Sequence, residues 1–113
     1  MSASAVNIGA GDALGSADAA VVVTADTGSV ALNVVLLWCE TDSNAICINP
    51  AVAASTAINT IIGDAAKTFS VFAFDQTSGA GIPLDAANSR VFLRFKSAGG
   101  INYSVTSAAI TVQ

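Results

Sequence analysis

Cys39 and Cys47 are the two cysteines of this 113-residue chain, and they are the side chains best suited to redox or metal chemistry. Their spacing is not that of a C-x-x-C redox or zinc motif. The chain has no histidine, and two thiolates alone would leave half of a tetrahedral zinc site unfilled. The sequence therefore predicts neither a metal centre nor a redox-active pair.

The same two cysteines leave two structural interpretations. A disulfide would close a short loop if Cys39 and Cys47 face each other across a hairpin. Synthesis in the reducing cytoplasm favours the other interpretation, in which free cysteines pack as small apolar residues. The sequence favours simple packing, and the disulfide stays the alternative, more so if the mature protein leaves the cell.

Other catalytic groups lack a recognisable arrangement. Without histidine the commonest general base is missing, and neither G-x-S-x-G nor S-x-x-K occurs in the chain. The glycine-rich residues 9–15 do not match a dinucleotide-binding loop, because Leu14 takes the place of the third glycine. Residues 75–85 lack the aspartate order of a calcium-binding EF-hand. We predict a protein that is not an enzyme and that holds no cofactor or metal.

Charge is sparse and uneven in this acidic chain. Only 11% of the residues are charged, where about 25% is usual for soluble domains, and the net charge is −4. Residues 1–66 hold six acids and no base, whereas residues 67–113 hold all four bases and two acids. A weakly charged surface tends to associate, and the uneven charge would allow head-to-tail docking of copies. Nucleic acid is not expected as a partner, because four bases release few counterions.

The beginning of the chain lacks the features of a secretory signal. It has no basic region and no continuous apolar stretch of signal-peptide type. No apolar run approaches the roughly 18 residues that a membrane span needs. We expect cytoplasmic synthesis without a signal peptide, no membrane partner, and a final place that could be a virion.

The clearest alternation in the chain lies at residues 89–97. Val91, Leu93 and Phe95 share one face, which we expect to point into the core. The other face carries a mixed basic and aromatic set: Arg90, Phe92, Arg94 and Lys96. Arginine and aromatic side chains are typical interface anchors, so this face is the predicted interaction surface. The competing interpretation buries Phe92 under a helix.

Turn and propensity signals divide the rest of the chain. Residues 1–17 are expected to form an extended N-terminal arm, and residues 18–113 a single compact β-rich domain. The apolar runs 19–25 and 30–39 are predicted strands that pair as a hairpin, with Trp38 in the core. A change of apolar parity toward the C-terminus predicts a bulge or break near residues 107–109.

One segment is predicted to be helical. Asn49 can cap a helix, Pro50 suits its first turn, and apolar residues follow at 3–4 spacing through residue 62. A strand at residues 57–62 is the competing interpretation. The predicted fold is therefore α+β and β-dominated: an antiparallel sheet of five to six strands with one helix near 50–62. An all-β sandwich is the alternative.

These observations favour a non-enzymatic structural protein of a large assembly. Few charges, small size and a surface of small polar residues suit a viral (phage) capsid decoration or cement protein, or a minor virion protein. Such a protein would act through self-association and binding to a shell, so the expected partners are copies of itself and a larger protein shell. A surface or carbohydrate-binding module is the alternative, and a small enzyme is a remote one.

Overall fold

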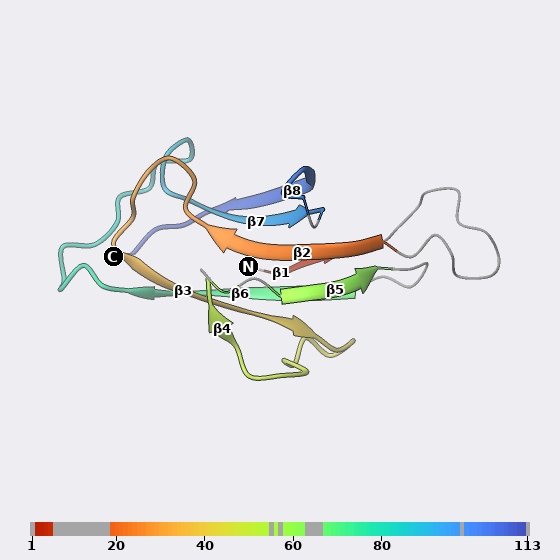
Figure 1. The fold of residues 1–113 in the computed structure, drawn as a ribbon. Helices are drawn as coiled ribbons and strands as arrows, with labels where there is room; N and C mark the ends of the chain where they lie inside the picture. Colours follow the sequence, from red (N-terminus) through yellow and green to blue (C-terminus); the bar gives the residue numbers. More distant parts are fainter. Residues whose placement is uncertain are drawn as a thin grey trace.

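Two antiparallel sheets packed face to face form the described part of the chain (Figure 1). The structure is a computed structural model and describes residues 2–5, 19–54, 56, 58–62, 67–97 and 99–112. Sheet A has the order β1 (Ser2–Ala5), β6 (Lys67–Asp75), β3 (Val34–Thr41), β4 (Val52–Ala53). Sheet B has the order β5 (Ile58–Ile62), β2 (Ala19–Asp26), β7 (Arg90–Lys96), β8 (Asn102–Ala109). The described residues thus form the β-sandwich that the sequence offered as its alternative.

The predicted helix near 50–62 is wrong. Its described residues form β4, which pairs with Leu37 and Trp38, and β5, which pairs with residues 19–23 of β2. Isoleucine and threonine at 58–62 prefer strands, and pairing with a distant strand outweighs the local 3–4 apolar spacing.

The predicted single sheet and its first hairpin are also wrong. β2 belongs to sheet B and β3 to sheet A, so residues 27–33 carry the chain from one sheet to the other (Figure 1). β2 instead pairs with β5 and β7, and β3 pairs with β4 and β6. A sheet with one apolar face must bury that face against a second layer. Because β2 and β3 belong to different sheets, each sheet supplies the layer that covers the apolar face of the other.

The core lies between the sheets and draws on both. Its buried members are Val21, Val23, Ala25, Val91, Leu93 and Phe95 from sheet B, with Leu36, Trp38, Phe69 and Val71 from sheet A. Phe69 touches Trp38 within its own sheet and Phe95 across the gap, at ring-centroid distances of 6.4 and 5.3 Å. The predicted inward face of residues 89–97 and the predicted core position of Trp38 are confirmed.

The two ends of the chain differ in part from expectation. Ser2–Ala5, within the predicted 1–17 arm, is an edge strand paired with the chain's own β6, and residues 6–17 lie outside the described part. β8 continues regularly through Ala109, and the register shift lies at Phe95/Lys96 instead of at 107–109. The change of parity arises because the strand ends there, after which the Ile110 N–H donates to the Ser89 carbonyl at 2.8 Å.

Candidate interaction surfaces

The predicted basic and aromatic surface lies on the outer face of sheet B, along β7. There the Arg94 guanidinium donates two hydrogen bonds to the Asp26 carboxylate of β2, from Nε to Oδ2 at 2.6 Å and from Nη2 to Oδ1 at 3.0 Å. Arg94 also lies over the Phe92 ring, 5.0 Å from its centroid. Arg94, one of the four residues predicted to bind a partner, is therefore held by its own chain through a bidentate ion pair and a cation–π contact.

Phe92 is half-buried, and the turn after β2 covers it. A Cβ added to Gly28 would lie 2.7 Å from Phe92 Cε2, and Gly28 has a φ of +72°, so the backbone crosses close to the ring. No helix covers Phe92 in the described residues, so the competing interpretation is wrong in its detail. A partner would reach only the part of the ring that Gly28 and Arg94 leave open.

Arg90 is likewise engaged within the sheet. Its Nη2 and Nε donate to the Ser107 hydroxyl of β8 at 2.9 and 3.1 Å, and its Nη1 donates to the Ala86 carbonyl at 2.6 Å. Lys96 is partly buried and lies opposite Val22 of β2 and Asn102 of β8. The four predicted residues thus share one face, and a role for them in binding a partner stays a prediction.

The environment of Asp26 sets its titration. Burial would raise the pKa of this carboxyl, but hydrogen bonds from Arg94 and from the Gly28 N–H, at 2.7 Å, outweigh burial and lower the pKa below 3.8. The nearby charges of Arg94 and Lys96 act in the same direction. A lowered folded-state pKa stabilises the fold above the unfolded pKa, and this contribution disappears as the pH falls through the folded value.

We expect Asp26→Asn to lower the free energy of unfolding by about 1 kcal/mol at pH 7, because the pair with Arg94 is partly exposed to solvent. The difference from wild type should shrink as the pH is lowered from 5 to 2, where both proteins carry a neutral side chain at this position. Urea denaturation at pH 7 and at pH 2.5 measures it, with Arg94→Gln as the background in which the effect should be small. A difference independent of pH would contradict the assigned role of the pair.

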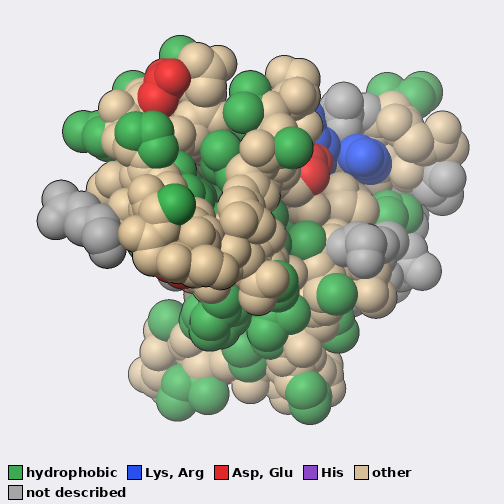
Figure 2. Space-filling view, turned by 90° about the vertical axis from the view of Figure 1, so that its left-hand side faces the viewer, with side chains coloured by type: hydrophobic (Ala, Val, Ile, Leu, Met, Phe, Trp, Pro, Cys, Tyr) green, Lys and Arg blue, Asp and Glu red, His purple; other side chains and the backbone are tan. Residues whose placement is uncertain are grey.

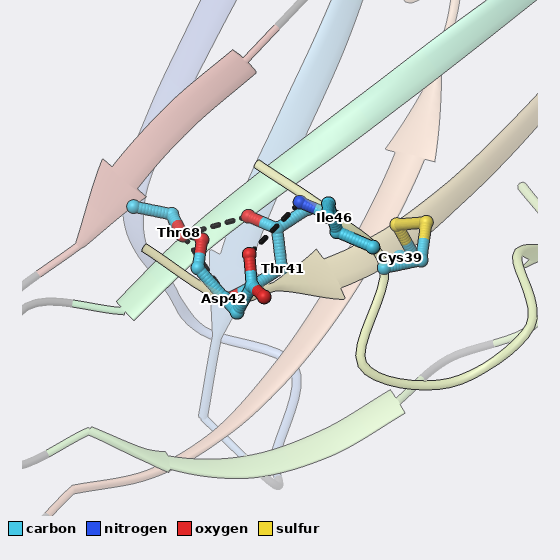
Figure 3. The surroundings of a disulfide bond; sticks show 6 residues. Cys39, Thr41, Asp42, Ile46 and Thr68 are labelled. Carbon is cyan, nitrogen blue, oxygen red and sulfur yellow. Dashed lines mark hydrogen bonds between the residues drawn. A yellow bond between two sulfur atoms is a disulfide. The ribbon is translucent and has the colours of Figure 1, made fainter. Parts of the chain in front are cut away.

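The cysteines form the second feature of interest. Cys39 and Cys47 are joined by a disulfide with a Cα–Cα distance of 5.6 Å, so the favoured interpretation of free, packed cysteines is wrong (Figure 3). The sequence favoured free cysteines because synthesis in the reducing cytoplasm was expected, although a hairpin would allow the two residues to face each other. The bond ties β3 to the loop that follows it, at the point where Thr41 and Cys47 form an isolated bridge.

Local hydrogen bonds shape the loop that the disulfide closes. Asp42 Oδ1 accepts from the N–H groups of Asn44 and Ile46 at 2.8 and 3.0 Å, and the Asp42 N–H donates to the Ile46 carbonyl at 2.9 Å. Ala45 takes a positive φ of 62° at the tip. The Asp42 carboxylate therefore serves as a turn cap, and the loop has a defined shape that brings Cys47 back to β3.

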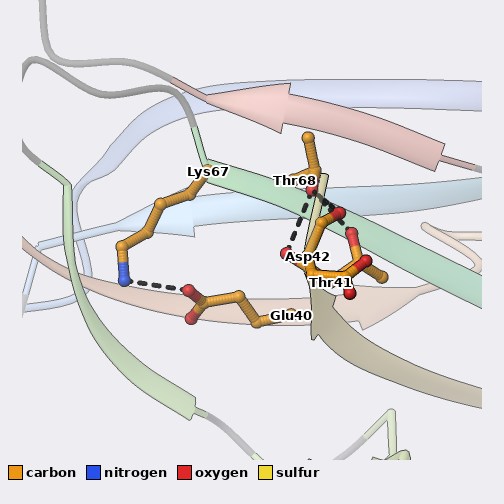
Figure 4. A network of polar contacts seen from close by, with 5 residues as sticks. All are labelled: Glu40, Thr41, Asp42, Lys67 and Thr68. Atoms are coloured by element: carbon orange, nitrogen blue, oxygen red, sulfur yellow. Dashed lines mark hydrogen bonds and ion pairs between the residues drawn. The ribbon is translucent and has the colours of Figure 1, made fainter. Parts of the chain in front are cut away.

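A polar network borders the same end of sheet A (Figure 4). Lys67 Nζ of β6 lies 2.9 Å from Glu40 Oε1 of β3, and the Thr41 hydroxyl lies 2.6 Å from that of Thr68. Strand alternation places Glu40 and Lys67 on the side that faces sheet B, with Trp38 and Phe69. Asp75, the last residue of β6, has the same parity, so none of the three charged residues of these two strands lies on the outer face of sheet A.

The outer face of sheet A exposes large hydrophobic side chains to solvent. Val35 lies directly opposite Phe74, and Leu37 lies directly opposite Phe72, on the side away from the core. We call these four residues the apolar block. Val35, Phe72 and Phe74 are 41%, 40% and 51% exposed. Figure 2 shows hydrophobic side chains spread over one end of the molecule, in the upper left of the view as well as in its lower half.

Sequence reasoning missed the apolar block, although a signal existed. The run 30–39 is nearly continuous in apolar residues, and the stretch 68–74 has phenylalanine at both parities. Because β3 and β6 are neighbours and both carry apolar residues on each face, their outer face is an apolar surface that only another part of the chain or a partner could cover. The described structure leaves it exposed.

Comparisons with known proteins add no relative to this description. No protein family, no curated protein and no solved structure matched the chain. Within the described ranges, no group of three or more histidine, cysteine, aspartate or glutamate residues is placed to hold a metal ion. The described residues also include no helix of sufficient length and apolar character to cross a bilayer.

Proposed function

We propose that this chain is a structural subunit of a larger protein assembly and acts through protein–protein contacts instead of catalysis. The observation that carries the proposal is the apolar block, which exposes Phe72 and Phe74 side by side on a sheet face. Apolar surface of this kind costs free energy in water and is characteristic of interaction sites when it is contiguous. The low fraction of charged residues, 11%, acts in the same direction because repulsion between copies is weak.

In its specific form, the proposal makes the chain a capsid decoration or minor virion protein of a phage, bound to a larger shell. The disulfide supports an assembly that matures outside the reducing cytoplasm, since such bonds persist in oxidising surroundings. A surface rich in small polar residues and a short loop closed by a disulfide suit a subunit that must remain folded while exposed on a particle.

A carbohydrate-binding role is the second candidate. Two exposed aromatic rings two residues apart on one strand, Phe72 and Phe74, offer a flat apolar platform for sugar rings. Sugar binding also needs polar groups that fix the hydroxyls. The outward hydroxyl nearest to these rings along β6, that of Ser70, is buried, and the next ones, those of Thr41 and Thr68, bond to each other, so the platform favours a protein partner.

The decisive measurement is the mass of the protein in gently lysed source cells. We expect it to sediment with particles far larger than the 11.2 kDa chain, and to remain with them in 0.5 M salt because the contact is apolar. A matched sample treated with oligosaccharides should show no release. Sedimentation as a free chain, or release by a sugar, would contradict the assembly proposal and favour a monomeric protein or the second candidate.

A further inference from the structure

We propose that the outer face of sheet A binds the same face of a second copy of the chain, related to the first by a two-fold axis. The inference rests on the proposed structural function and names one of its contacts. The surface consists of the apolar block and the backbone of β3 and β6 that supports it. Directly opposed residues stand about 5 Å apart and successive outward residues about 7 Å apart, so the four side chains form one continuous patch.

Charge selects the partner. The outward positions described on β3 and β6 beyond the apolar block are Cys39, Thr41, Thr68 and Ser70, and β4 adds Ala53 opposite Leu37. None of these side chains carries a charge under ordinary conditions, since Cys39 is in the disulfide. A nucleic acid, an acidic peptide or a basic peptide finds no complement on this face, whereas an identical apolar face does.

The net charge of −4 leads to the same choice of surface. Two copies repel each other least where neither exposes a charged group at the contact. On the outer face of sheet B, by contrast, two copies would bring Arg90, Arg94 and Lys96 of each chain together, and the Asp26 carboxylate, which pairs with Arg94, offsets only part of this charge. Two-fold self-association is therefore electrostatically more favourable through sheet A than through sheet B.

The area of the face determines how strong the contact is. β3 and β6 have 8 and 9 residues. With a rise of about 3.3 Å per residue and strands about 4.8 Å apart, a two-strand face of this size covers roughly 270 Å². Two copies would bury at most about 540 Å², because Cys39, Thr41 and Ser70 of the same face are already buried, and this is below the size of stable specific interfaces. The expected dimer is weak and depends on concentration, as suits one of several contacts in an assembly.

Sheet geometry allows this contact without rearrangement. Two sheets pack face to face about 10 Å apart, with side chains of the inner faces interdigitating. Across a two-fold axis each contact occurs twice, so a contact from Phe74 to Phe72 of the second copy is matched by the reverse contact. The phenylalanine rings, which are about half-exposed in the single chain, would supply most of the buried apolar area.

Sedimentation equilibrium of the oxidised, purified chain tests the inference. We expect a monomer near 10 µM and a dimer near 1 mM, the range of a weak interface. Phe74→Lys and Val35→Lys should each weaken dimerisation by 10-fold or more, because they place two like charges inside the contact. Leu84→Lys is the matched control, since Leu84 is 74% exposed in the β6–β7 loop, and it should change dimerisation by less than 2-fold. Thermal unfolding confirms that each variant is folded.

Chemical-shift changes in a concentration series then locate the contact. Changes confined to β3 and β6 support the inference, whereas changes along β7 and β8 would assign the contact to sheet B and overturn it. A monomer at 1 mM, a trimer, or equal effects of Phe74→Lys and Leu84→Lys would also overturn it. If the purified chain stays monomeric but sediments with large particles in cells, the proposed function survives and the inference fails. If the chain dimerises but sediments in cells as a free dimer, the inference survives and the proposed function fails.

Discussion

Trp38→Ala should lower the free energy of unfolding by about 4 kcal/mol, the largest effect that we expect from a single substitution in this chain. Trp38 is 0% exposed and belongs to β3, in the middle of sheet A. Its ring touches Phe69, and Phe69 reaches across the sandwich to Phe95, so the tryptophan supports the contact between the sheets. Its Nε1–H also donates to the Thr56 carbonyl at 3.1 Å, a bond that alanine cannot make.

Urea denaturation followed by circular dichroism measures this loss, since the substitution removes the tryptophan as a fluorescent probe. The midpoint of thermal unfolding should fall by about 15 °C. Phe72→Ala is the matched control: it removes a large side chain from the neighbouring strand, but on the outer face, where 40% is already exposed. We expect a cost of only about 1 kcal/mol there. Equal losses for the two variants would mean that the core does not lie between the sheets.

The sequence predicted best what depends on the strand itself. In β7 the side chains alternate between two faces because the pleat requires it, and Val91, Leu93 and Phe95 are all buried as expected. Trp38 could be placed in the core for a similar reason, since its size makes exposure costly. These features need no knowledge of which strand lies next to which.

The pairing of strands that are distant in the chain could not be predicted from the sequence. Residues 58–62 become a strand because β2 lies beside them, 35 or more positions away in the chain, and local spacing suggested a helix instead. β2 and β3 are close in sequence but join different sheets. In both cases the deciding interaction is with a partner strand, and periodicity in a short window reports only on burial of one face.

The same limit explains what was predicted of the surfaces. Residues of β7 could be assigned to one outward face, but the Asp26 that binds Arg94 is 68 positions away, so internal pairing could not be foreseen. The apolar block combines residues 35 and 37 with 72 and 74. Each pair was visible as an apolar run, and only the antiparallel register of β3 and β6 makes them one surface.

The disulfide should contribute about 2.5 kcal/mol to stability, from loop-closure entropy for a sequence separation of 8. A reductant should therefore lower the thermal midpoint of the wild-type chain by about 10 °C while leaving the sandwich folded. The sheets should persist because β3 keeps its eight-residue pairing with β6, which does not involve the loop. Differential scanning calorimetry with and without reductant measures the shift.

The double variant Cys39→Ala, Cys47→Ala separates the bond from its side chains. It should unfold near the temperature of the reduced wild type and should not respond to reductant at all. Asp42→Ala in the oxidised chain gives the complementary result: it removes the cap of the same loop, so the effect of reductant should become smaller if the cap and the bond hold one structure. A wild-type midpoint that moves by less than 2 °C on reduction would show that the bond does not restrain the unfolded chain. The proposed role on a particle outside the reducing cytoplasm would then lose its support from the disulfide.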